Sequence, residues 1–219
     1  MVIDDLGRSV EEVESLERLG VPLTYSVLPY EEQTAEVIAA LRRHGDEILC
    51  HLPMEPVSGQ NPGPGALRAN MDAGELRAAT AAALAAVPGA VGVNNHMGSR
   101  LSADDRSMHA VLGVLADRKL FFLDSRTSAD SVGYRVAMAL GLPAAQRQVF
   151  LDGDQRPQII REQFARLLAI ARDRGAAIAI GHPHPSTIEA LTAEVPRAKS
   201  LGYRFVPVSD LLDRPAPAR

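Results

Sequence analysis

Aspartates and histidines in this chain often follow short apolar runs directly. The pair Asp4-Asp5 follows the run Met1–Ile3, and His51 lies at the end of the run Glu47–Leu52. The other polar groups in such positions are Asn94, Asn95, His96, Asp124, Asp152, His182 and His184. If the apolar runs are parallel strands, their carboxyl ends meet at one face, so these side chains are expected to converge there.

Three of the six histidines occupy these strand ends, namely His51, His96 and His182. His44 and His109 lie instead on predicted helices, where exposure to solvent is the ordinary outcome. A single histidine is more often structural than functional, but three of them beside a paired carboxylate favour a shared site. One carboxylate and two imidazoles with an open position suit a divalent metal of the zinc type that activates water.

Asp152 is interpreted differently from the other strand-end residues. It lies in the sequence Asp152-Gly153-Asp154, which is typical of a turn in which an aspartate bonds to its own backbone. We therefore expect Asp152 to be a turn residue outside the chemistry of the site.

The apolar runs alternate with helical patterns along the chain. Predicted strands are Met1–Ile3, Leu23–Val27, Glu47–Leu52, Ala90–Val93, Phe121–Leu123, Val149–Leu151, Ala176–Ile180 and Arg204–Val206. Seven helices are predicted between them, beginning near Ser9, Glu31, Asp72, Asp104, Val132, Pro157 and Thr187. This alternation predicts a single α/β domain over residues 1–219, and the strand count favours a distorted parallel (β/α) barrel over an open doubly wound sheet.

Two local features of these elements are also predicted. Ser9 with Glu12, and Asp72 with Glu75, have the spacing of capping boxes at helix starts. The segment Val57–Asn70 is rich in proline and glycine, so it is expected to be a mobile surface loop over or beside the site.

Composition restricts the classes of function. The formal net charge of −4 and the scattered basic residues give no electrostatic footprint for nucleic acid, which is therefore not an expected partner. The single cysteine, Cys50, excludes an internal disulfide. No apolar run is long enough to span a bilayer. Because Met1–Ile3 resembles the tail of a buried strand, we expect upstream sequence that could carry an export signal or anchor.

Five segments of the chain, in order, resemble the divergent branch of the polysaccharide deacetylase superfamily, whose general members share the NodB-homology fold. They are Ile3-Asp4-Asp5-Leu6-Gly7, His51-Leu52-Pro53-Met54-Glu55-Pro56, Gly92-Val93-Asn94-Asn95-His96-Met97-Gly98-Ser99, Phe121-Phe122-Leu123-Asp124-Ser125-Arg126-Thr127 and Ile180-Gly181-His182-Pro183-His184-Pro185. The resemblance covers most of the chain and implies a deacetylase-type barrel, a carbohydrate or peptidoglycan-fragment partner, and a periplasmic or other extracytoplasmic location.

The resemblance also implies a metal site for a divalent ion such as Zn²⁺. It gives Asp5 and His51 as ligands. The superfamily has a second histidine four residues after the first, and this chain has Glu55 in that position, so His96 is the preferred third ligand. Whether Glu55 or His184 also joins the metal stays open.

The catalytic residues that the resemblance implies are Asp4, His182 and Asp124. Asp4 would be the general base, His182 the general acid that protonates the departing amine, and Asp124 the residue that orients His182. Either Arg100 or Arg126 could hold Asp4 ionised through a charge-assisted bond.

These roles predict a metal-dependent hydrolase that removes acetyl groups from a carbohydrate or peptidoglycan-like substrate. The chain has no tryptophan and is only 4% aromatic, with Tyr30 as the one obvious strand-end aromatic, so a short glycan is favoured over an extended polymer. One alternative is a metal-binding carbohydrate or cell-envelope module without turnover. A further metal hydrolase such as a phosphoesterase ranks third, because it needs cationic groups aimed at phosphate.

Overall fold

The computed structural model describes residues 1–214, and in them eight parallel strands form one curled sheet. The strands are β1 (Val2–Leu6), β2 (Thr24–Val27), β3 (Glu47–Met54), β4 (Gly92–Met97), β5 (Phe121–Asp124), β6 (Ala144–Gln146), β7 (Val149–Phe150) and β8 (Ala179–Gly181). Their order across the sheet is β6-β5-β4-β3-β2-β1-β8-β7. The expected single α/β domain with a distorted parallel barrel is confirmed as a curled half-barrel whose edge strands are β6 and β7.

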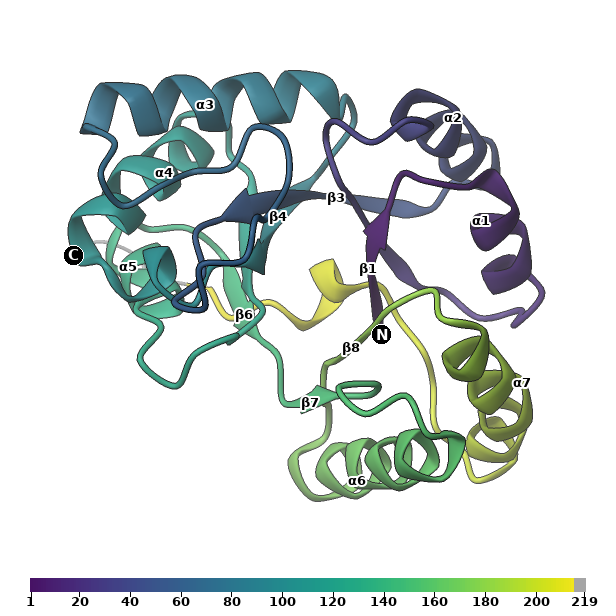
Figure 1. Cartoon of the computed structure of the whole chain (residues 1–219). Coiled ribbons are helices and arrows are strands. Elements are labelled where there is room, and N and C mark those ends of the chain that lie inside the picture. The colour runs from purple at the N-terminus through teal and green to yellow at the C-terminus, as the bar shows by residue number, and fades with distance from the viewer. Residues whose placement is uncertain (215–219) are drawn as a thin grey trace.

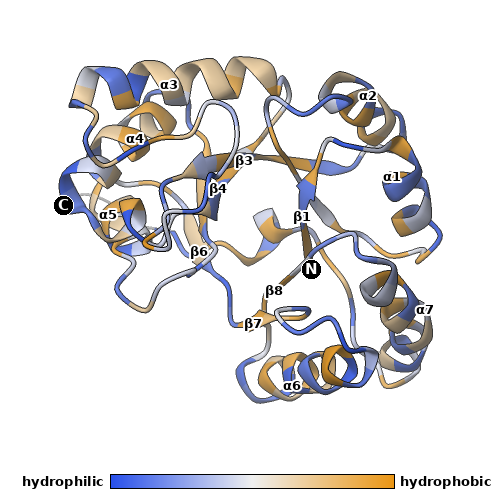
Figure 2. Cartoon of the chain, viewed as in Figure 1, coloured by the Kyte–Doolittle hydropathy of each residue, from blue (hydrophilic) through white to orange (hydrophobic). Residues whose placement is uncertain are grey.

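Seven α-helices cover the outside of this sheet (Figure 1). They are α1 (Val10–Glu17), α2 (Thr34–His44), α3 (Ala73–Ala86), α4 (Asp105–Asp117), α5 (Gly133–Ala139), α6 (Pro157–Arg174) and α7 (Pro185–Ser200), with short 3-10 helices η1 (Leu101–Ala103) and η2 (Val208–Leu211). In α6 and α7 the hydrophobic and hydrophilic residues alternate around the helix, whereas the alanine-rich α3 is mostly hydrophobic (Figure 2). None of the described helices is long and apolar enough to cross a membrane.

Alternation along the strands divides the buried side chains into two sets. One apolar cluster fills the space between sheet and helices and includes Cys50 and Phe122. A smaller cluster fills the inside of the curl and includes Val2, Leu49 and Ile180. Because successive strand side chains point to opposite faces, a residue two positions after a member of the inner cluster also points inward. This rule decides which polar residues can meet at the carboxyl ends.

One expected strand is absent from the structure, and one strand is present that was not expected. Residues 204–206 form no strand, although Phe205 and Val206 are residue types that favour one. The eighth strand is instead β6, whose sequence Ala144-Ala145-Gln146 carries no β signal. β6 forms because residues 122–124 of β5 have a free edge for it to pair with.

The predicted loop between β3 and α3 is partly tied to the sheet. Val57 is exposed, but Leu67 is fully buried and bridges Met54 in parallel. The Leu67 N–H donates to Pro53 O at 2.9 Å, and the Glu55 N–H donates to Leu67 O at 2.9 Å. The second half of the segment is therefore tied to the sheet, and the mobility of the segment stays a prediction.

Of the two predicted capping boxes, one is present. Asp72 Oδ1 accepts from the Glu75 N–H at 2.8 Å, and Glu75 Oε2 accepts from the Asp72 N–H at 2.8 Å. At the start of α1, Ser9 is the N-cap but makes no side-chain cap bond, and its hydroxyl donates to Glu11 instead. The capping box predicted for Ser9 with Glu12 is therefore wrong.

Candidate metal centre and active site

Three side-chain atoms from different strands face one another at the carboxyl ends. Asp5 Oδ1 lies 3.1 Å from His51 Nε2 and 2.8 Å from His96 Nδ1, and the two imidazole nitrogens are 3.2 Å apart. Ligands that bind zinc at about 2.0–2.2 Å must themselves lie about 3 Å apart. The separations and the donor types of this triad therefore fit a single divalent metal, and the triad brings together the three residues expected as ligands.

A bulge in β1 turns Asp5 into the site. The β1–β2 register shifts between Ile3 and Leu6, and Asp5 has a left-handed backbone with φ of 63°. Regular alternation would place Asp4 and Asp5 on opposite faces, whereas a bulge re-aims one side chain, so both carboxylates reach the inside of the curl. The sequence pair alone does not reveal this device.

The Asp5 carboxylate has the charge and the free electron pair of a ligand. Burial raises the pKa of Asp5, but His51 and His96 outweigh burial and hold that pKa well below its ordinary value. Its Oδ1 atom is buried without a hydrogen-bond partner in the described part of the chain. A buried acceptor without a donor is costly, and a bound cation would remove that cost.

Asn94 links the metal triad to Asp4. His51 Nδ1 lies 2.8 Å from Asn94 Oδ1, and Asn94 Nδ2 donates to Asp4 Oδ1 at 2.8 Å. Since an amide oxygen only accepts, His51 Nδ1 carries the proton and Nε2 keeps its lone pair toward the triad. Asp4 is buried, and its other oxygen lies 3.5 Å from His51 Nε2. Asn94 thus fixes both the imidazole tautomer and the carboxylate.

His182 and Asp152 form a hydrogen-bonded pair beside Asp5. His182 Nδ1 lies 2.9 Å from Asp152 Oδ1, while His182 Nε2 points toward Asp5 Oδ2 at 3.9 Å. Burial alone would lower the pKa of His182, but the hydrogen bond to Asp152 and the negative charges of Asp152, Asp4 and Asp5 together outweigh burial and raise that pKa to about 9. His182 is therefore an imidazolium near neutral pH, with Nε2–H directed at the centre.

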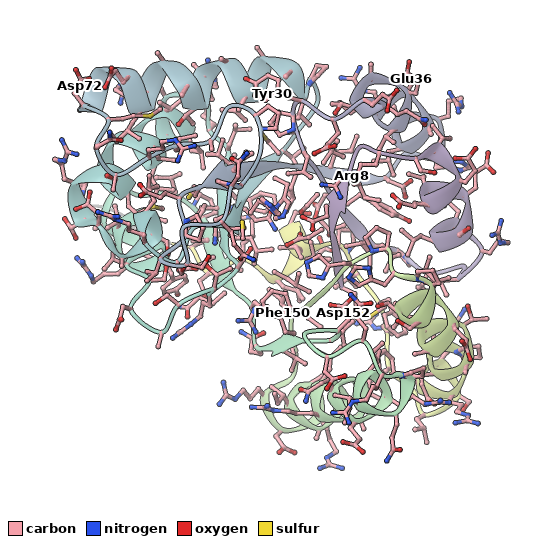
Figure 3. The ribbon with its side chains drawn as sticks, in the orientation of Figure 1. Arg8, Tyr30, Glu36, Asp72, Phe150 and Asp152 are labelled. Atoms are coloured by element: carbon pink, nitrogen blue, oxygen red, sulfur yellow. The ribbon has the colours of Figure 1, made fainter. Side chains whose placement is uncertain are left out.

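Asp152 is held firmly in this role. Besides the imidazole, it accepts the His182 backbone N–H at 2.6 Å and the Thr187 hydroxyl at 2.8 Å. Phe150, two residues earlier, stacks on the His182 ring with centroids 5.8 Å apart and planes 7° apart. Figure 3 shows Phe150 and Asp152 side by side near the middle of the molecule. Assigning Asp152 only to a turn was wrong.

The expected pairing of Asp124 with His182 is also wrong. Asp124 shares the outward parity of Phe122, so its carboxylate points toward the start of α5. There it accepts from the Ser131 hydroxyl at 2.7 Å and from the Tyr134 N–H at 3.1 Å. Asp124 thus acts as an anionic cap on a helix N-terminus, and Asp152 occupies the place beside His182.

Glu55 and the two arginines expected near Asp4 have other partners. Glu55 accepts from the Ala69 N–H at 2.7 Å and pairs with Arg100 at 3.2 Å, away from the triad. Arg126 donates to the Gln146 side chain at 2.8 Å. Within residues 1–214, neither arginine pairs with Asp4, so Asn94 takes the supporting place that was expected for a guanidinium.

His184 lies beside His182 rather than in the metal triad. Their ring centroids are 5.5 Å apart, and His184 with Asp152 and His182 makes a second group whose ligand atoms are mutually close. Asp152 and His182 Nδ1 are already bonded to each other, which makes this group a poor competitor for metal.

Reasoning from the sequence placed Asn94 and Asp152 at strand ends but missed the roles that they have in the site. Both could have been found from parity, since Asn94 lies two positions before His96 and Asp152 two positions after the inward Phe150. Ser125 follows the same rule, two positions after Leu123, and its hydroxyl accepts from Asn94 at 3.3 Å.

The curled parallel half-barrel with its covering helices matches the fold of the CE4 deacetylases. The chain belongs to the divergent polysaccharide deacetylase family, whose model matches residues 1–212. It is 36% identical to the uncharacterized protein YibQ of Escherichia coli over 215 residues, which are 98% of this chain and 67% of that protein.

Two solved structures share this fold. An uncharacterized protein from Agrobacterium tumefaciens superposes with a TM-score of 0.90 at 29% identity, covering 96% of this chain and 87% of that one. A CE4 family pseudoenzyme from Bacillus anthracis superposes with a TM-score of 0.55 at 16% identity, covering 97% and 64%. A mutant of that pseudoenzyme has restored enzymatic activity. At 16% identity the similarity to the pseudoenzyme shows the fold alone.

Proposed function

We propose that this chain is a metal-dependent carbohydrate deacetylase, a hydrolase that acts on the acetamide bond of an acetylated sugar. The observation that carries the proposal is a triad of Asp5, His51 and His96 with the Asp4 carboxylate 3.5 Å from His51 and the His182 imidazole 3.9 Å from Asp5. Membership of the divergent polysaccharide deacetylase family supports the reaction class. We assign the metal to this triad, with Zn²⁺ as the ion that its donors suit.

A divalent ion held by this triad would act as a Lewis acid on the acetyl carbonyl and lower the pKa of water. Asp4 is the residue placed to take the proton from that water, because its Oδ2 faces the triad while its Oδ1 is fixed by Asn94. Holding one oxygen with an amide N–H keeps the carboxylate in a single orientation and leaves the other oxygen free to accept the proton.

His182 is the residue placed to protonate the leaving amine. Its Nε2 points to the centre, and the Asp152 hydrogen bond keeps the imidazole charged at neutral pH. An amine anion leaves poorly, so the reaction needs an acid on the side of the site opposite the base. Asp152 is a positioning residue that sets the orientation and the pKa of His182.

The substrate that we propose is an acetylated carbohydrate or a peptidoglycan-like fragment. The family description names polysaccharides, and Tyr30, which follows β2 and is 39% exposed, offers an aromatic face for a sugar ring (Figure 3). A single aromatic face suits a short glycan better than a long groove.

The alternative is a carbohydrate-binding or cell-envelope module that keeps the metal but has no turnover. It is favoured by one observation, namely that a pseudoenzyme also adopts this fold. In that case Asp4 and His182 would serve binding only.

Acetate release distinguishes the two functions. The zinc-loaded protein is incubated with acetylated chitooligosaccharides and with peptidoglycan fragments, and acetate is measured against a chelator-treated sample. The deacetylase predicts release that depends on metal and is lost in His182→Ala. A protein that binds these glycans but releases no acetate from any of them would contradict the enzyme and support the binding module.

A further inference from the structure

Two arginines beside the candidate centre have no carboxylate partner. Arg126 follows β5, and Arg147 lies between the two edge strands β6 and β7. Within residues 1–214, neither guanidinium is within 4 Å of a carboxylate oxygen, whereas Arg8 and Arg100, which follow β1 and β4, each pair with a glutamate at 3.1 and 3.2 Å. The charges of Arg8 and Arg100 are therefore neutralised by glutamates, whereas the positive charges of Arg126 and Arg147 are not.

Arg147 is fixed by contacts that leave part of its guanidinium free. Its Nε donates to Ser125 O at 2.6 Å and its Nη2 to Arg126 O at 2.7 Å, and the group lies over the Phe150 ring with Cζ 4.1 Å from the centroid. Guanidinium has five N–H donors, so three of them remain for a ligand. Burial lowers the pKa of Arg147, and the nearby positive charge of Arg126 lowers it further. Two like charges are thus held close together.

Arg126 is held in an unusual backbone conformation. Its φ of 48° lies in the left-handed region, which costs energy for a residue other than glycine. The conformation is fixed by the Arg126 N–H, which donates to Asp124 Oδ1 at 2.8 Å, and by the side chain, which donates to Gln146 at 2.8 Å. Strain at a single exposed arginine is consistent with a residue placed for a ligand.

Arg147 is linked to the reaction centre through two stacked rings. The Phe150 ring under Arg147 also stacks on His182, and His182 Nε2 is 3.9 Å from the Asp5 ligand. Arg147, Phe150, His182 and Asp5 therefore form one continuous row of contacts. A molecule seated at the metal would reach the arginines with a neighbouring substituent.

We propose that Arg126 and Arg147 form an oxyanion subsite, and that the substrate carries a carboxylate on the acetylated sugar or on its neighbour. The identity of the bound sugar as a substrate rests on the proposed deacetylase function. The anion-binding subsite itself does not require turnover. Guanidinium forks bind carboxylates through paired charge-assisted hydrogen bonds, and a bound anion would relieve the repulsion between the two arginines.

A purely structural role for Arg147 makes a different prediction. The negative charges of Asp124 and Asp4 raise the pKa of Arg147, although neither carboxylate lies within ion-pair distance of its guanidinium. If it served only to support those carboxylates, its loss would change their behaviour, and Arg126, which is exposed, would contribute nothing to ligand preference. The two arginines are therefore tested separately.

The test compares two sugars that differ by a carboxylate. Binding of N-acetylmuramic acid and of N-acetylglucosamine to the zinc-loaded protein is measured by calorimetry at low salt, with inorganic phosphate as a third probe. We expect the acidic sugar to bind at least about tenfold more tightly, and we expect Arg126→Gln and Arg147→Gln each to reduce that preference about tenfold. Arg156→Gln, whose native arginine is exposed and paired with Asp154, is the matched control and should leave the preference unchanged.

Several results would overturn the subsite. Equal binding of the two sugars would do so, as would a preference that survives in both variants, or inorganic phosphate binding as tightly as the acidic sugar, which would indicate a site for free anions. If Arg147→Gln fails to fold, Arg147→Lys and Arg126→Gln are measured in its place. A preference for the acidic sugar without acetate release would contradict the proposed function and support the subsite. Acetate release without any preference for the acidic sugar would support the proposed function and contradict the subsite.

Discussion

The neighbouring aspartates Asp4 and Asp5 have different surroundings, and so we expect their substitutions to have different effects. Asp5→Asn replaces an anionic ligand with a weak neutral one, so bound metal and acetate release should fall together. Asp4→Asn keeps the bond from Asn94 but cannot accept a proton, so metal should stay while turnover falls by about 10²–10⁴-fold. Elemental analysis and acetate assays on both proteins check this, and equal loss of metal in both would contradict the division of roles.

A second residue-scale prediction concerns the charge on His182. In the metal-free protein the imidazole pKa should be about 9, because Asp152, Asp4 and Asp5 together outweigh burial. Asp152→Asn removes the negative charge beside the imidazole, so the pKa should fall. Since the folded pKa lies above that of the unfolded chain, this pair stabilises the fold fully below about pH 6.5 and loses that contribution as pH rises through about 9.

Proton NMR titration of the imidazole measures this pKa directly. The control is Asp154→Asn, which removes an exposed carboxylate two residues away that pairs with Arg156. A His182 pKa that is the same in Asp152→Asn as in the parent would show that Asp152 does not set it.

The sequence predicted the residues that gather at the site better than it predicted which of them touch. Asp5, His51 and His96 were expected as a triad and lie together, because each follows a strand whose end is recognisable from its apolar run. Asp124 and Asp152 both follow strands too, and their partners depend on parity, which a shift of one residue reverses. Phe122 lies on the same face of the sheet as Asp124, and Phe150 lies on the same face as Asp152. These phenylalanines reveal the orientation of the two aspartates only when the face that each phenylalanine occupies is already known.

At the scale of elements, the seven helices and seven of the eight strands could be predicted, since periodic apolar patterns and glycine stops mark them. β6 could not, because three residues without β-forming side chains pair only when β5 offers an edge. The segment 204–206 shows the opposite case, because its residues favour a strand but pair with none of the strands of the sheet. Short strands are fixed by their neighbours rather than by their own sequence.

The two helix starts make an element-scale prediction. Asp72 bonds the Glu75 N–H and belongs to a complete capping box, while Ser9 makes no cap bond. Asp72→Ala should therefore lower the free energy of unfolding by about 1 kcal/mol, and Ser9→Ala by clearly less. Denaturant unfolding of both variants measures the difference. A loss at Ser9 equal to that at Asp72 would contradict the capping seen here.

At the scale of the whole molecule, the proposed metal connects strands that are distant in the sequence. Its ligands come from β1, β3 and β4, within a sheet whose edges β6 and β7 are not joined by a ladder in the described residues. Binding to the folded chain alone should therefore stabilise the entire domain. The curled sheet is not closed into a ring of strands. The metal that joins three of its strands should therefore raise the stability of the whole domain rather than of one region.

Thermal unfolding with and without zinc tests this effect. At zinc a hundredfold above its dissociation constant, binding should add about 2.7 kcal/mol to the stability, which corresponds to a rise in Tm of about 5–10 °C for a chain of this size. A chelator should reverse the rise. His51→Ala and His96→Ala should lose it because each removes one ligand, while Asp4→Asn should keep it because its carboxylate is not a ligand. A zinc-dependent Tm that survives in both histidine variants would place the metal elsewhere in the molecule.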